Sequence, residues 1–243
     1  MARRGTVGPP AAPARRDLRT KRERPTFSGM TALAAPHLLT RGHHKTRVTG
    51  ALPVLGDEGL APARVHEICG PARIALALAI AGATVGPVIW ILRDRGGERP
   101  NPDGAAEWMD PGRLVFVQPK RVDEALWTME ETLRAGVVPL VVADLAEPPA
   151  LTPVRRLQLA AEAGAGGLAA QAAGGLRPTG LILTPEDGGA PGVESRWFLA
   201  PRHRPGTDAW RLDRRRARMA PERGWDVRRG DAAAFRDAPP AGP

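Results

Sequence analysis

The chain has 243 residues, 42% of them hydrophobic, which is enough for one sizeable α/β domain with terminal tails. Its single cysteine, Cys69, excludes an internal disulfide and a zinc site built on paired cysteines, and favours a reduced, cytoplasmic protein. An apolar run of about 18 residues, as a membrane-spanning helix requires, does not occur in the sequence. The basic N-terminus also lacks the apolar segment of a secretory signal.

The formal net charge of +9 is unevenly distributed. Residues 1–50 carry 11 Lys and Arg against 2 Asp and Glu, and residues 202–229 carry 10 Arg against 4 acidic residues. Two basic zones around a neutral centre favour nucleic-acid binding. The predominance of Arg over Lys, with abundant Ala, Gly and Pro, is equally typical of a GC-rich coding bias, and both interpretations stay open.

The chain is expected to have three parts. Residues 1–50 are predicted to be a disordered basic region, because Arg, Pro and Gly dominate and few apolar residues could offset the entropy of ordering. Met30 is an alternative start of the translated chain. Residues 51–230 are expected to form one domain, and residues 231–243 are predicted to be a disordered tail.

Strands and helices alternate within the domain. In chain order we expect strand 64–69, helix 71–82, strands 87–92 and 113–118, helix 121–136, strand 137–145, helix 152–164 and strands 179–184, 194–200 and 209–217. The last two strands have no helix between them, so they are expected to pair antiparallel. The pattern predicts an α/β fold, a mostly parallel sheet with antiparallel C-terminal strands and helices on both faces.

The stretch "EICGPARIALAL" has the layout of a phosphate-binding loop, with a strand, a glycine and a helix. Such a loop follows the pattern G-x-x-x-x-G-K-[ST], in which the lysine and the hydroxyl contact phosphate and magnesium. Counted from Gly70, the last three positions are Ala75, Leu76 and Ala77. Leu76 and Ala77 are expected to pack in the core, which favours a structural turn, although a helix N-terminus still attracts anions.

Two aspartates follow apolar strands. Asp144 ends "LVVAD", which has the form of a Walker-B strand, and Asp94 follows "PVIWILR". Both would lie at the carboxyl edge of the sheet and could hold magnesium through water if a nucleotide bound there. An aspartate in this position often only caps a loop, so we expect no catalytic residue, metal or cofactor. The vestigial nucleotide site would comprise Gly70, Pro71, Arg73, Asp94 and Asp144.

The loop "TPEDGGAPGVESRW" and the arginine-rich strand after it are the candidate contact surface. Glycines suit a flexible contact loop, and arginines between Trp210 and Trp225 suit phosphate contacts and base stacking. An ordinary connection with positive φ at its glycines and a charge-protected edge strand explain the same residues. Strand alternation would then place Trp210 and Leu212 on one face and Arg211 on the other. The candidate DNA or partner contacts are Gly188, Gly189, Gly192, Glu194, Arg196, Trp197, Arg211, Arg214, Arg215, Arg216 and Arg218.

Read in order, these segments resemble the RecA core over residues 64 to about 218. "VHEICGP" resembles the strand that leads into RecA's phosphate loop. Residues 112–153 resemble its strand, helix and Walker-B strand, while "GLILT" and "ESRWFLAPRH" resemble the strands that flank its second DNA-binding loop. The resemblance implies a RecA-like three-layer core with a degenerate Walker-A loop, since the lysine, the hydroxyl and the second glycine are absent.

The combination is most similar to the inducible-mutagenesis protein A (ImuA) family and its SulA-like relatives. "GPAR", "DPGRLVFV", "LTPVRRLQLAAEAG" and "DGGAPGVESRW" carry this resemblance, the last two most specifically. It implies a non-enzymatic accessory protein of the SOS response to DNA damage, acting in mutagenesis and translesion DNA synthesis. Its implied partners are an inactive Y-family-like polymerase subunit and an error-prone polymerase, with RecA or single-stranded DNA as further candidates.

Two alternatives stay open. One is a SulA-like inhibitor that binds the cell-division protein FtsZ, because it would share the degenerate RecA fold. The other is a divergent NTPase that uses Asp94 and Asp144 with an unusual phosphate loop.

Overall fold

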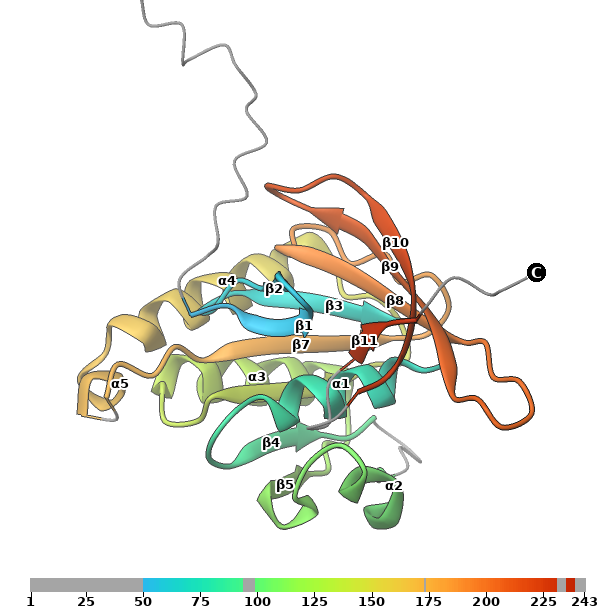
Figure 1. Ribbon diagram of the computed structural model, residues 1–243. Helices are drawn as coiled ribbons and strands as arrows, with labels where there is room; N and C mark the ends of the chain where they lie inside the picture. The colour runs from blue at the N-terminus through green and yellow to red at the C-terminus, as the bar shows by residue number, and fades with distance from the viewer. Residues whose placement is uncertain (1–49, 94–98, 173, 231–234, 239–243) are drawn as a thin grey trace, which may run out of the picture. The chain divides into compact units, whose positions relative to one another are not determined.

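The computed structural model describes residues 50–93, 99–172, 174–230 and 235–238 (Figure 1). The basic region predicted over residues 1–50 therefore lies outside the described residues except for Gly50, and so does Asp94. No helix among the described residues is both long and apolar enough to cross a membrane.

In the described residues, eleven strands form one sheet with the order β2-β1-β11-β10-β9-β8-β3-β7-β6-β4-β5. The strands are β1 (Leu52–Leu55), β2 (Glu58–Leu60), β3 (Val65–Cys69), β4 (Val88–Ile91), β5 (Leu114–Val117), β6 (Leu140–Asp144), β7 (Thr179–Thr184), β8 (Ser195–Pro201), β9 (Ala209–Ala217), β10 (Arg223–Arg229) and β11 (Phe235–Asp237). From β5 to β8 every neighbouring pair is parallel, whereas β8, β9, β10 and β11 pair antiparallel. The predicted mostly parallel sheet with antiparallel C-terminal strands is confirmed.

Helices cover both faces of the sheet, as predicted (Figure 1). The helices are α1 (Arg73–Gly82), α2 (Pro102–Ala106), α3 (Val122–Ala135), α4 (Leu151–Gly166) and α5 (Leu168–Ala172), with a 3-10 turn η2 at Pro111–Arg113. α1 packs on β1, β3, β7 and β8, and α3 and α4 pack beside each other on the opposite face.

Strand β6 shows why both faces need a helix layer. Leu140 and Val142 belong to the core under α1, while Val141 and Ala143 belong to the core under α3 and α4. Successive side chains of a strand point to opposite faces, so an unbroken apolar run must be covered on both sides.

The C-terminal half of the sheet extends beyond the predicted strands. β10 was not expected, and β11 falls within the segment predicted to be a disordered tail, so that prediction is wrong for Phe235–Asp237. The buried Phe235 ring packs against Trp108 and Trp210, with centroid distances of 4.9 and 5.4 Å. These contacts join residues far apart in the sequence, and they stabilise a strand too short to be recognised locally.

Candidate functional site

The turn between β3 and α1 packs directly against strand β8. Gly70 has φ of +91°, and a Cβ atom there would lie 2.6 Å from the Leu199 carbonyl oxygen and 2.8 Å from the Phe198 ring. The Ala72 amide donates a hydrogen bond to the same Leu199 oxygen at 3.0 Å. An amide at the start of α1, where a phosphate loop would face its ligand, is therefore bonded to the protein's own backbone.

The residues that replace the phosphate-binding side chains lie in the core. Leu76 and Ala77 are both completely buried, as the spacing from Gly70 predicted. Pro71 is exposed at the turn. The β3–α1 turn thus has the backbone layout of a phosphate loop, but its side chains provide packing in place of phosphate contacts.

Asp144, at the end of β6, is paired with two arginines. Its Oδ1 atom lies 3.5 Å from a guanidinium nitrogen of Arg73, in the first turn of α1, and 3.3 Å from one of Arg93, just after β4. The carboxylate is buried, so these two cations balance its charge. They also oppose the approach of a divalent cation. Among the described residues no cluster of His, Cys, Asp and Glu could hold a metal ion.

The glycine-rich loop between β7 and β8 is held by the buried carboxylate of Glu67. Glu67 Oε1 accepts hydrogen bonds from the Thr184 hydroxyl and the Gly189 amide, both at 2.8 Å. Its Oε2 accepts from Arg196 Nε at 2.5 Å. Gly188 has φ of +68°, and a Cβ there would lie 2.6 Å from Glu67 Oε1. The glycines therefore let the loop pass close to Glu67, which supports the interpretation as a packed connection.

The arginine strand β9 alternates as predicted. Trp210 and Leu212 are buried, and Arg211 lies on the other face, where it pairs with Asp213 and Asp226 at 2.8 and 3.6 Å.

The same alternation places Arg214 in the interior. Its side chain is 5% exposed, forms an ion pair with Glu58 and donates from Nε to the Pro221 carbonyl at 3.0 Å. Its guanidinium lies over the rings of Trp197 and Trp225, 5.6 and 5.5 Å from their centroids. Arg214 and the fully buried Trp197, both expected at the contact surface, thus stabilise the sheet from within.

Two further candidate contact residues also have partners within the chain. Arg215 pairs with Asp187 at 2.6 Å and lies 3.7 Å from the centre of the Phe198 ring. Glu194 lies between Arg64 and Arg218, at 3.8 and 3.9 Å.

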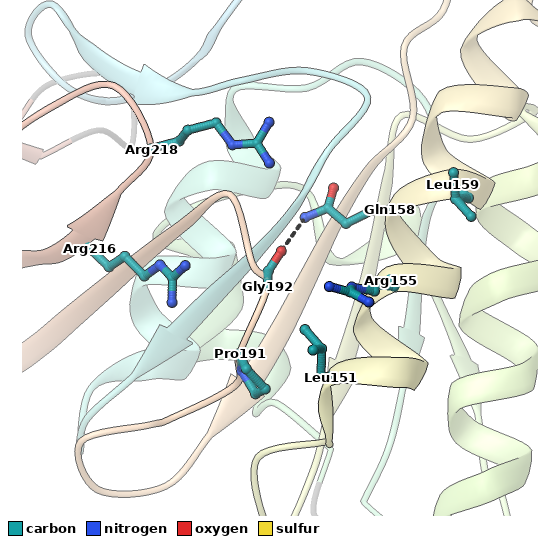
Figure 2. Close-up of a pocket in the computed structure, with 8 residues that line it drawn as sticks. All are labelled: Leu151, Arg155, Gln158, Leu159, Pro191, Gly192, Arg216 and Arg218. Carbon is teal, nitrogen blue, oxygen red and sulfur yellow. Dashed lines mark hydrogen bonds between the residues drawn. The ribbon is translucent and has the colours of Figure 1, made fainter.

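Arg216 and Arg218 line a hollow of about 580 Å³ between α4 and the glycine-rich loop. Figure 2 shows the eight residues around it, Leu151, Arg155, Gln158, Leu159, Pro191, Gly192, Arg216 and Arg218. We call this hollow the arginine groove. Three of the predicted contact residues, Gly192, Arg216 and Arg218, lie here.

The α4 side of the arginine groove was not predicted. Leu151, Arg155 and Leu159 are all exposed, and their spacing of four residues places them along one stripe of the helix. Two exposed leucines on either side of an arginine are the signal that the sequence offered, because the buried face of α4 carries its own apolar residues Val154, Leu157 and Ala160.

His66 of β3 and Ser195, the first residue of β8, form a buried polar pair. His66 Nδ1 lies 2.7 Å from Ser195 Oγ, and Nε2 lies 2.9 Å from the Ala61 carbonyl oxygen. Burial lowers the pKa of His66 to about 4, so the ring is neutral, and its Nε2–H donates the hydrogen bond to the Ala61 carbonyl. Ser195 Oγ in turn accepts from Trp197 Nε1 at 2.9 Å. Each group has its partner inside the core, which makes the pair structural.

Cys69 is equally enclosed. Burial, and then the neighbouring Glu67 carboxylate, raise the pKa of its thiol to about 12. The thiol is therefore protonated at neutral pH, and it donates a weak hydrogen bond to the Trp197 carbonyl at 3.4 Å.

Comparison of the chain with protein-family models and with curated proteins finds no match.

Proposed function

We propose that this chain is a non-catalytic, RecA-like accessory protein that acts by binding other macromolecules. The observation that carries the proposal is the β3–α1 turn. At the place where a nucleotide's phosphates would lie, the Ala72 amide donates to Leu199, and Gly70 leaves no room between the turn and β8. A scaffold needs a surface for its partner and no nucleotide, so this geometry suits a binding role.

The biological role follows from the resemblance to the inducible-mutagenesis protein A family. We infer a cytoplasmic accessory factor of DNA-damage-induced mutagenesis, which docks a Y-family-like polymerase subunit during translesion synthesis. The arrangement of the resembling segments supports a RecA-like core. The strand that leads into the degenerate loop, β3, pairs on one side with β7 and on the other with β8. The Walker-B-like strand β6 pairs with β7 and ends at Asp144.

The divergent NTPase is less compatible with this geometry. Asp144 would have to exchange two guanidinium partners for magnesium, and Leu76 and Ala77 offer nothing to a phosphate. The SulA-like role requires the same degenerate fold, so it is separated from the proposal by experiment.

A deletion strain tests the biological role. We expect loss of the gene to lower the frequency of ultraviolet-induced mutation, and expression of the wild-type chain from a second locus to restore it. An unchanged induced-mutation frequency in the deletion strain would contradict the proposal. Overexpression is the second arm, since filamentous cells with normal induced mutation would indicate the FtsZ-binding alternative.

A further inference from the structure

The arginine groove brings together three arginines, two of which have no acidic partner among the described residues. Arg211, Arg214 and Arg215 of β9 each form an ion pair with an acidic residue. Arg155 and Arg216 form none with any described residue, and Arg218 reaches only Glu194, at 3.9 Å. None of the described residues that line the groove is acidic. Its charge is therefore available to an anionic ligand.

Apolar side chains lie beside these cations. Leu159 is 64% exposed and Leu151 is 38% exposed, and both line the groove with Pro191. Binding is favoured when an apolar group of the ligand covers an exposed leucine, because each Å² of apolar surface removed from water contributes about 25 cal/mol to the binding free energy. A ligand that fits this groove therefore combines negative charge with aliphatic groups.

The walls of the groove are held in place before any ligand arrives. The Gln158 side chain donates to the Gly192 carbonyl at 3.3 Å (Figure 2). It also donates to the Val65 carbonyl at 3.0 Å and accepts from the Val65 amide at 3.1 Å. At Gly192, φ is +80° and an added Cβ would lie 2.9 Å from the Leu151 side chain, so the loop packs closely on α4. A preformed site has less conformational entropy to lose when it binds.

The spacing of Leu151, Arg155 and Leu159 along α4 determines how far apart the matching groups of a ligand must be. Leu151 and Leu159 are eight residues apart, which is about 12 Å at the 1.5 Å rise of an α-helix. Four residues of an extended peptide span about 13 Å, and every second side chain points to the same side. An extended segment of the pattern apolar-x-acidic-x-apolar would therefore place its two apolar side chains on Leu151 and Leu159 and its acidic side chain on Arg155.

We propose that the arginine groove binds an extended acidic segment of a partner protein with this pattern. Single-stranded nucleic acid fits less well, because it depends on aromatic side chains for base stacking, and the part of the chain that the structure describes places none in the groove. Trp197 and Trp210 are buried. The inference rests on the proposed function in one respect, that the chain acts by docking a protein partner.

The direct test is fluorescence anisotropy with the full-length chain and a labelled peptide, Ser-Leu-Glu-Asp-Glu-Leu-Ser. We expect saturable binding that weakens as salt is added. The double variant Arg155→Glu/Arg216→Glu should raise the Kd at least tenfold, and so should Leu159→Ser or replacement of both peptide leucines by serine. All three protein positions are exposed, so the variants should fold, as circular dichroism checks.

Arg204→Glu is the matched control, since Arg204 is an exposed arginine that does not line the groove, and it should leave the Kd unchanged. No saturable binding of the peptide to the wild-type chain would overturn the proposal, as would equal binding of the leucine-free peptide. Tighter binding of a labelled oligo-dT, weakened by the double variant while peptide binding is not, would make the groove a nucleic-acid site instead.

The two proposals fail in different ways. If the double variant restores ultraviolet mutagenesis fully in the deletion strain, the groove is not the docking site that mutagenesis needs, and the accessory role stands. If the deletion has no mutagenesis phenotype but the peptide binds as expected, the groove stands and the biological role does not.

Discussion

Replacement of Gly70 by alanine tests whether the β3–α1 turn packs against β8 as a structural turn or is open as a phosphate loop would be. The added Cβ would lie 2.6 Å from a backbone oxygen of β8, which cannot move without disturbing its strand, and 2.8 Å from the Phe198 ring. A non-glycine residue in a positive-φ conformation costs about 1–2 kcal/mol, and overpacking adds about 1–3 kcal/mol. We therefore expect Gly70→Ala to lower the free energy of unfolding by about 2–5 kcal/mol. For a domain of this size that is a fall in Tm of roughly 5–15 °C.

Urea unfolding followed by circular dichroism measures the difference, with Gly104→Ala as the matched control. Gly104 lies in α2, and a Cβ there meets nothing within 4 Å, so the substitution should be neutral or stabilise by at most about 1 kcal/mol. A free energy of unfolding for Gly70→Ala within about 0.5 kcal/mol of the wild type would show that the turn does not pack on β8.

Three further predictions concern buried groups. His66 has a pKa of about 4 when folded and 6.5 when unfolded, so the unfolded chain binds more protons below pH 6.5 and stability falls as the pH drops. Between pH 7 and pH 5 the wild type should lose about 2 kcal/mol more than His66→Gln, and equal losses in urea titrations would contradict this. Cys69, with its pKa raised to about 12, should resist iodoacetamide in the folded chain and react in urea; fast alkylation without denaturant would show that the core opens. Arg214→Met should cost about 2 kcal/mol, because it removes the closer of the two arginines that pair with Glu58 and the hydrogen bond to the Pro221 carbonyl, while Arg223 stays 3.8 Å from Glu58. Arg216→Met should cost under about 0.5 kcal/mol, so similar midpoints for the two variants would contradict the burial of Arg214.

The parallel half of the sheet was predictable because its signals are local. Apolar runs such as "LVVAD" are typical of central strands, and the pattern of α3 has the period of a helix with one buried face. β10 and β11 carry no such signal, since "RGWDVRR" is mostly polar and charged and Phe235–Asp237 is three residues long. Their stability comes from contacts with residues that are distant in the chain, such as the packing of Phe235 on Trp108.

In the candidate sites, too, the features with a local sequence signal were predictable, and those that depend on contacts between distant residues were not. Spacing from Gly70 predicted that Leu76 and Ala77 would be packed, and both are buried, but the contact between the turn and Leu199 depends on a strand more than 100 residues later. The alternation that correctly buried Trp210 and Leu212 would also have buried Arg214, two residues beyond Leu212.

The arginine groove could not be predicted as a unit. Arg155 is on a helix and Arg216 is on a strand of the antiparallel half of the sheet, and nothing in their sequence neighbourhoods links them. Arg215 pairs with Asp187, whereas Arg155 and Arg216 have no ion-pair partner among the described residues. This difference becomes visible only in the folded structure.

Equilibrium binding of ATP with magnesium is the most direct test of the central claim, that the β3–α1 turn is a structural element and the chain a scaffold. Isothermal titration calorimetry of the wild-type chain should detect no saturable binding up to millimolar nucleotide. Micromolar binding that is abolished by Asp144→Ala would contradict the claim, because it would mean that β8 leaves the turn and that Asp144 exchanges its arginines for magnesium.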